Sequence, residues 1–175
     1  MDYKFETRCI HRENEHEEGH PYGSVCTPIY QTATYAHPGV GQSTGYDYSR
    51  LQNPTKEHLE KTVASLENGI DALAFSSGMA AITLMMELFK PGDHLIVDAD
   101  LYGGSIRLFN HVSEKNGIEF SSVDCYKENV AGYIRENTKA VYIETPTNPM
   151  MNVTDIKALA EITKEHNLLL IVDNT

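Results

Sequence analysis

The chain has 175 residues, of which 41% are hydrophobic and 22% are charged, and its formal net charge is −11. This composition is typical of a globular protein with a core of ordinary size. The acidic balance disfavours nucleic-acid binding, which needs a basic surface, and docking to an anionic membrane. Segment 1–18 is charged and lacks the apolar region of a signal peptide, and the apolar runs are too short to cross a bilayer.

Residues 1–52 are polar, rich in Gly, Pro, Thr and Tyr, and lack periodicity. Such a segment has little core of its own, so we expect an N-terminal arm that lies over a second subunit. Asn53 and Pro54 then read as the start of a helix that Gly69 ends. The segment 53–175 is expected to form a separate α/β domain.

The later elements alternate between strands and helices. Strands are predicted over 71–75, 94–99, 118–123, 140–144 and 168–173. Helices are predicted over 78–89, 105–115, 127–136 and 155–166. This alternation predicts a mostly parallel sheet with helices on both faces, and ligands bind such sheets beyond the carboxyl ends of the strands.

Small residues fill the turn between a predicted strand and the apolar helix that starts at Gly78. Ser76, Ser77, Gly78 and Met79 would bring free backbone N–H groups to an anion such as phosphate. An ordinary strand–helix turn is the alternative.

Asp173 ends the apolar strand 168–173, where a carboxylate is costly to desolvate without a partner. It could ligate magnesium, cap a helix, or pair with the protonated nitrogen of a pyridine ring.

Two further turns carry candidate side chains. Asn148 stands between two prolines that fix its loop, and it could donate to a phenolate oxygen or form a plain turn. Tyr102 precedes two glycines and could stack on a flat ring or be an exposed loop residue.

Tyr48 and Arg50 are two residues apart in the arm. In an extended segment their side chains would lie on the same side and could both reach a phosphate. A solvated arm is the alternative.

Together and in this order, these motifs resemble the Cys/Met-metabolism, or trans-sulfuration, family of pyridoxal-phosphate enzymes. That family includes cystathionine gamma-synthase, cystathionine gamma- and beta-lyases, and methionine gamma-lyase. The resemblance covers most of the chain and rests on segments 27–32, 48–50, 76–81, 102–104, 144–149 and 172–175. It implies the fold of type I pyridoxal-phosphate transferases and a homo-oligomer, a dimer of dimers, with shared active sites.

The resemblance also implies roles for the cofactor-binding residues. Ser77, Gly78 and Met79 would bind the cofactor phosphate, with Gly78 and Met79 contributing backbone N–H groups. Tyr48 and Arg50 would bind the phosphate of a neighbouring subunit.

The remaining implied roles concern the ring and the substrate. Tyr102 would stack on the pyridine ring and assist proton transfer, and Asp173 would pair with the ring nitrogen. Thr175 would touch the ring face and Asn148 would lie near the ring hydroxyl. Arg107 would bind the substrate, a sulfur amino acid.

Position 104 bears on which member of the family the chain resembles. Methionine gamma-lyases commonly carry a cysteine there, whereas this chain has Gly104. The resemblance therefore favours cystathionine gamma-lyase or gamma-synthase, with cystathionine beta-lyase and methionine gamma-lyase as alternatives.

The family holds its cofactor on a lysine of a Ser-x-Thr-Lys segment that follows Asp-Asn-Thr, and no lysine of this chain stands in such a segment. We therefore expect the domain 53–175 to be incomplete and the chain to be the front part of an enzyme. The alternative is a truncated, catalytically inactive product that binds subunits or phosphate.

Two other patterns concern metals and location. Segment 16–20 matches His-Glu-x-x-His, but the neighbouring Gly19, Pro21 and Gly23 disfavour the helix that a zinc site needs, so we expect no metal. Three scattered cysteines without a Cys-x-x-Cys pair indicate reduced thiols and a cytoplasmic protein.

Overall fold

The computed structural model describes residues 3–11 and 21–175, and the chain divides into two units, Met1–Phe75 and Ser76–Thr175. The first unit extends beyond residue 52 because it includes the long helix Pro54–Leu66, which contacts the N-terminal residues. Arg8 donates from Nη1 to the carbonyl of Ser65 in that helix at 2.6 Å.

The first unit contains the short helix α1 (Phe5–Arg8), the 3-10 turn η1 (Pro21–Gly23) and helix α3 (Pro54–Leu66). Helix α3 starts as its sequence predicts: the side chain of Asn53 accepts from the N–H of Thr55 at 2.9 Å, and proline takes the first helical position.

The first unit has no core of its own. None of its side chains for which the structure describes exposure is buried. Leu59 and Val63, on α3, are 53% and 42% exposed. An exposed apolar helix face of this kind favours contact with another protein surface.

The strand predicted over 71–75 is wrong. The N–H groups of Ala72 and Ala74 donate to the carboxylates of Asp71 and Glu60, at 2.8 and 2.7 Å. A strand needs a neighbouring strand to accept its hydrogen bonds, and in the described part of the chain none pairs with this segment.

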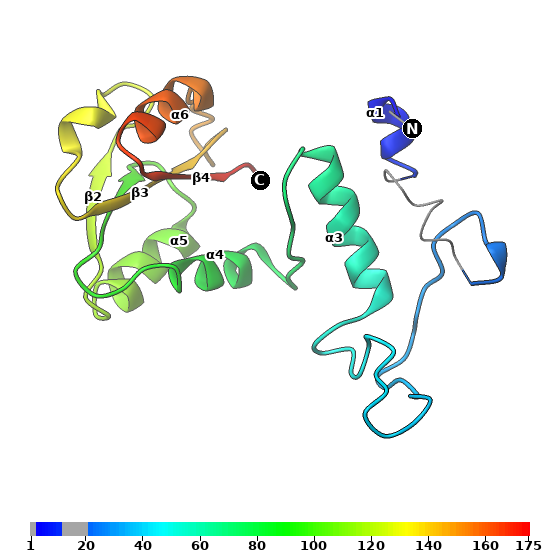
Figure 1. Ribbon diagram of the computed structural model, residues 1–175. Helices are drawn as coiled ribbons and strands as arrows, with labels where there is room; N and C mark the ends of the chain where they lie inside the picture. Colours follow the sequence, from blue (N-terminus) through cyan, green and yellow to red (C-terminus); the bar gives the residue numbers. More distant parts are fainter. Residues whose placement is uncertain (1–2, 12–20) are drawn as a thin grey trace. The chain divides into compact units, whose positions relative to one another are not determined.

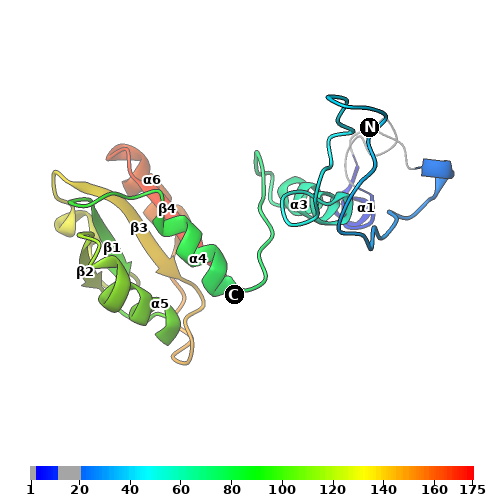
Figure 2. The same cartoon turned by 90° about the horizontal axis from the view of Figure 1, so that it is seen from below.

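The second unit is built on a parallel sheet of four strands in the order β2-β1-β3-β4 (Figures 1 and 2). The strands are β1 (His94–Asp98), β2 (Glu119–Val123), β3 (Thr138–Glu144) and β4 (Leu169–Asp173). Their carboxyl ends therefore lie along one edge of the sheet. This arrangement confirms the predicted α/β class.

Helices cover both faces of this sheet (Figure 1). Helices α4 (Gly78–Met86) and α5 (Gly103–Leu108) lie on one face, and α6 (Ile156–Glu165) lies on the other. Successive strand residues alternate between the two cores: Leu95 and Val97 pack in the first, and Ile96 packs in the second.

Two predicted helices differ from the structure. Residues 105–115 are not one α-helix, because α5 continues as the π-helical segment η2 (Phe109–Ser113). Residues 127–136 contain only the 3-10 turn η3 (Val130–Tyr133). The side chain of Asn129 accepts from the N–H of Ala131 at 3.2 Å, and Ile134 is already extended, which confines the helix to one turn.

Within residues 3–11 and 21–175, no helix combines the length and apolar character needed to cross a membrane. The same residues include no group of three or more His, Cys, Asp or Glu side chains that could hold a metal ion. The His-Glu-x-x-His pattern at 16–20 lies outside the described residues.

Candidate cofactor site

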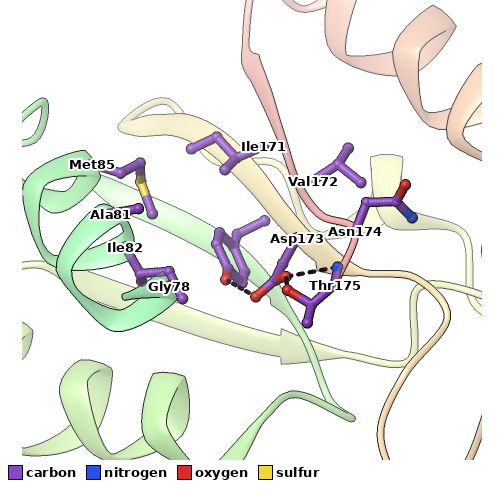
Figure 3. Close-up of a pocket in the computed structure, with 10 residues that line it drawn as sticks. Gly78, Ala81, Ile82, Met85, Ile171, Val172, Asp173, Asn174 and Thr175 are labelled. Atoms are coloured by element: carbon purple, nitrogen blue, oxygen red, sulfur yellow. Dashed lines mark hydrogen bonds between the residues drawn. The ribbon is translucent and has the colours of Figure 1, made fainter. Parts of the chain in front are cut away.

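A pocket of about 360 Å³ opens where the amino end of α4 meets the carboxyl ends of β3 and β4. It brings together seven residues that the sequence singles out, along with Ile82 and Glu144. The seven are Ser77, Gly78, Met79, Tyr102, Asn148, Asp173 and Thr175. A second, more apolar pocket of about 450 Å³ shares Gly78, Ile82, Asp173 and Thr175 with it (Figure 3).

The amino end of α4 is suited to an anion. Ser77 caps the helix, since its Oγ accepts from the N–H of Ala80 at 3.2 Å. The N–H groups of Gly78 and Met79 precede the first residue that can find an acceptor within the helix. No atom lies within 4 Å of the position that a Cβ on Gly78 would take, so a ligand can approach the backbone there.

Asp173 is held by three donors at the end of β4. Its Oδ1 accepts from the N–H and the hydroxyl of Thr175, at 3.2 and 2.7 Å, and its Oδ2 accepts from the Tyr142 hydroxyl at 3.3 Å (Figure 3). Burial, with the negative charge of Asp173 beside it, raises the pKa of Tyr142, which therefore stays a donor. The carboxylate keeps acceptor capacity for a cation or an N–H in the pocket.

Tyr102 is 47% exposed, and its ring lies directly against Gly104. A Cβ on Gly104 would lie 2.3 Å from Cε1 of Tyr102 and 2.8 Å from Sδ of Met79. The absence of a side chain at this position lets the ring take its place beside α4.

Glu144 is the site residue that sequence reasoning missed. It ends β3, is only 4% exposed, and accepts from the N–H of Tyr102 at 2.6 Å and from the N–H of Asn148 at 3.1 Å. Its signal was present in the sequence: like Asp173, it is a carboxylate at the end of an apolar strand.

Tyr48 and Arg50 lie in the first unit, and the guanidinium carbon of Arg50 is 4.6 Å from the centre of the Tyr48 ring. The predicted extended segment is wrong, because the N–H groups of Leu51 and Gln52 both donate to the carbonyl of Tyr48 and form a turn. The turn still places the two side chains together, in a cation–π contact.

Arg107 is exposed on α5 and is not among the residues that line the 360 Å³ pocket. Its Nη1 lies 3.4 Å from the position of a Cβ on Gly103, one turn earlier on the same helix. Arg107 therefore lies near Gly103 but outside the lining of this pocket, and its substrate-binding role stays a prediction.

The fold and this pocket identify a class of protein. The chain belongs to the family of pyridoxal-phosphate-dependent enzymes of cysteine and methionine metabolism, whose family model matches residues 6–175. The expected family, cofactor class and fold are thereby confirmed.

Particular relatives narrow the comparison. A cystathionine gamma-synthase/O-acetylhomoserine (thiol)-lyase of Bacillus subtilis (strain 168) is 50% identical over 180 residues, covering 100% of this chain and 47% of that protein. A cystathionine gamma-lyase of the same organism is 53% identical over 154 residues, covering 87% of this chain and 41% of that protein. The chain thus spans less than half the length of these relatives.

A solved structure supports the fold. The chain is similar to the cystathionine gamma-lyase from Lactobacillus plantarum complexed with L-serine, with a TM-score of 0.86 and 42% identity. The match covers 99% of this chain and 45% of that one.

The described residues fit the cofactor of the family. The open N–H groups of Gly78 and Met79 suit its phosphate, and the half-exposed ring of Tyr102 offers a stacking face. The carboxylate of Asp173 suits a protonated pyridine nitrogen. All of these residues line one pocket, so a single bound molecule can meet them at once.

Proposed function

We propose that the protein carrying this chain is a pyridoxal-phosphate-dependent trans-sulfuration enzyme, a cystathionine gamma-lyase or gamma-synthase. The observation that carries the proposal is the pocket in which phosphate donors, an aromatic face and a carboxylate lie together. The names of the relatives point to the same chemistry.

The chain's own residues would divide the work of binding and proton movement. Gly78 and Met79 bind the phosphate through backbone N–H groups, and Ser77 caps their helix. Asp173, held by Thr175, accepts from the ring N–H of the cofactor.

The loops that carry Tyr102 and Asn148 would contact the face and the hydroxyl of the cofactor ring. Tyr102, which lines the pocket, would lie against the ring, and its hydroxyl would accept or return a proton. Asn148 donates to the ring hydroxyl, and Thr175 contacts the face of the ring. The bound cofactor supplies an electron sink for the bond that breaks at the substrate's alpha carbon.

The product formed from cystathionine distinguishes the two kinds of elimination. For the gamma-lyase, we expect the full-length protein to release 2-oxobutyrate from cystathionine. For the gamma-synthase, we expect it to form cystathionine from cysteine and an O-acylhomoserine. Pyruvate from cystathionine would show a beta-lyase instead, and rapid cleavage of methionine would show a methionine gamma-lyase. No turnover of any of these substrates would contradict the proposal.

The first unit would complete the site of a second subunit in a dimer of dimers. Two observations support this assignment: the exposed apolar face of α3, and the neighbouring side chains of Tyr48 and Arg50, which together offer a hydroxyl and a guanidinium to a phosphate. A cytoplasmic location is also proposed, because the three cysteines are unpaired thiols.

A further inference from the structure

We infer that Glu144 is a positioning residue, which fixes Tyr102 and Asn148 at the spacing that the cofactor ring requires. The inference rests on the proposed function, since it concerns the same pocket. Glu144 itself need not touch the substrate, because it acts through the two backbone groups that it holds.

The first support is the geometry of the carboxylate. Each oxygen of Glu144 accepts one backbone N–H: Oε2 accepts from Tyr102 at 2.6 Å, and Oε1 accepts from Asn148 at 3.1 Å. The two acceptors belong to one planar group, so their separation is fixed by covalent geometry. The backbone positions of the two loops are thereby fixed relative to each other.

The second support is where Glu144 lies. It ends β3, which pairs on both sides with other strands, and its side chain is 4% exposed. Hydrogen bonds from backbone N–H groups to a carboxylate in such a place are stronger than bonds between neutral groups, and water competes for them little. The loops are therefore anchored to the most rigid part of the sheet.

The third support is that the two ends of the Tyr102 backbone are held by different partners. Its carbonyl accepts from the N–H groups of Ser105 and Ile106 in α5, at 2.9 and 3.2 Å, whereas its N–H donates to Glu144. Tyr102 occupies the N-cap position of α5, where its side chain makes no capping hydrogen bond. The helix therefore holds the carbonyl of Tyr102, and the direction of its N–H depends on Glu144. Glu144 supplies that hold from 42 residues away.

A second carboxylate keeps the loop after β3 in place independently. Oδ2 of Asp100 accepts from the hydroxyl of Thr147 at 2.5 Å and from Nδ2 of Asn152 at 3.1 Å. A change at Glu144 should therefore loosen the positions of Tyr102 and Asn148 without unfolding the loop.

The test compares Glu144→Gln with Asp98→Asn. Both replace a buried carboxylate at the carboxyl end of a strand by its amide. Asp98, 3% exposed, accepts from the N–H of Asp100 at 3.4 Å, a bond that the amide oxygen of asparagine can keep, and the N–H groups of Tyr102 and Asn148 donate to Glu144 instead. Glutamine offers only one accepting oxygen, so in the first variant at least one of the two N–H groups loses its partner.

Three quantities are measured on each protein. They are the amide hydrogen-exchange rates of Tyr102 and Asn148 by NMR, the dissociation constant of pyridoxamine 5'-phosphate, and that of inorganic phosphate. Pyridoxamine phosphate carries the ring and needs no lysine, whereas phosphate alone reports on Gly78 and Met79.

We expect Glu144→Gln to speed amide hydrogen exchange at Tyr102 or Asn148. We also expect the dissociation constant of pyridoxamine phosphate to rise by about tenfold or more, because a hydrogen bond to a charged acceptor is lost. Phosphate should bind as before, and Asp98→Asn should change none of the three quantities. If Glu144 only stabilised the fold, the variant would bind both ligands more weakly, and that result would overturn the inference. Unchanged exchange and unchanged ring affinity in Glu144→Gln would also overturn it.

The test separates this inference from the proposed function. If the unaltered protein fails to bind pyridoxamine phosphate, but Glu144→Gln still frees the two amides, the positioning role stands and the proposed function fails. If the unaltered protein binds the ligand and the variant binds it equally well, the function stands and the inference fails.

Discussion

Gly104 controls how closely the Tyr102 ring can approach helix α4. A methyl group there would meet Cε1 of Tyr102 at 2.3 Å and Sδ of Met79 at 2.8 Å, so one or both side chains must move. We expect Gly104→Ala to fold but to bind pyridoxamine phosphate about threefold to tenfold more weakly, since a stacked aromatic contact contributes about 0.5–1.5 kcal/mol. Isothermal titration calorimetry measures the change.

Gly103→Ala is the matched control for that substitution. Its added Cβ would meet only Nη1 of Arg107, at 3.4 Å, which is an ordinary contact with a movable side chain. Equal weakening in both variants would show that helix α5, and not the place of the Tyr102 ring, is what the methyl group disturbs.

At this same scale, sequence reasoning singled out seven of the residues that line the pocket but missed Glu144, which accepts from the backbone of two of them. Asp173 stood out because a carboxylate at the end of an apolar strand needs a partner. Glu144 meets the same criterion, but its partners are backbone N–H groups in two loops, and loop conformation is not encoded in residue type or periodicity. The substrate-binding role of Arg107 stays a prediction, since its exposed side chain lies along its own helix and outside the lining of the 360 Å³ pocket.

At the scale of elements, the amino edge of the sheet is tied together by His94. Its ring is fully buried and links three strands: Nδ1 lies 2.8 Å from Oγ1 of Thr138, and Nε2 lies 2.9 Å from Oγ of Ser121. Burial, aided by the nearby Arg135, lowers the pKa of His94, and Glu119 opposes this only in part. The neutral ring is therefore the form that the fold accommodates.

This depressed pKa predicts a loss of stability in acid. Below the ordinary pKa of 6.5 the unfolded chain binds a proton that the folded chain resists, so the contribution of His94 is complete above that pH and declines as pH falls through the lower folded value. Urea unfolding at pH 7.5 and at pH 5 should show less stability at pH 5. His94→Gln should be less stable by about 1–3 kcal/mol at pH 7.5 and should show a smaller pH dependence. An identical pH dependence in that variant would contradict this account of His94.

Strands whose apolar residues pack into the two cores were predicted well, whereas segments whose backbone N–H groups donate to side chains were not. The strands β1, β3 and β4 were predicted from apolar runs, because their successive residues pack into the cores on opposite faces of the sheet. Segment 71–75 has the same apolar character, but strand formation depends on a partner that its own residues cannot reveal. The helix over 127–136 failed because a single side chain, Asn129, satisfies the backbone in a tighter turn.

At the scale of the whole molecule, the two units make different demands on their surroundings. The second has two buried cores, whereas the first has none among its described residues. If the first unit supplies Tyr48 and Arg50 to another subunit, two different defects should complement each other in a mixed oligomer. Each hybrid pair would then contain one site with both defects and one with neither.

The full-length Arg50→Ala and Asp173→Asn proteins are suited to this experiment, since each lowers activity through a different unit. After the two are unfolded together and refolded, we expect activity on cystathionine to rise to about a quarter of the unaltered level, the share expected when half of the pairs are hybrid. Activity no higher than that of the separate variants would show that each subunit completes its own site.

The central claim is that the ends of β3 and β4 and the start of α4 form the seat of pyridoxal phosphate. The most direct test of this claim is the structure of the protein in crystals grown with pyridoxal phosphate. We predict the phosphate on the N–H groups of Gly78 and Met79, the ring against Tyr102, and the pyridine nitrogen within hydrogen-bond distance of Asp173. Cofactor bound elsewhere, or an empty pocket at a saturating concentration, would contradict the claim.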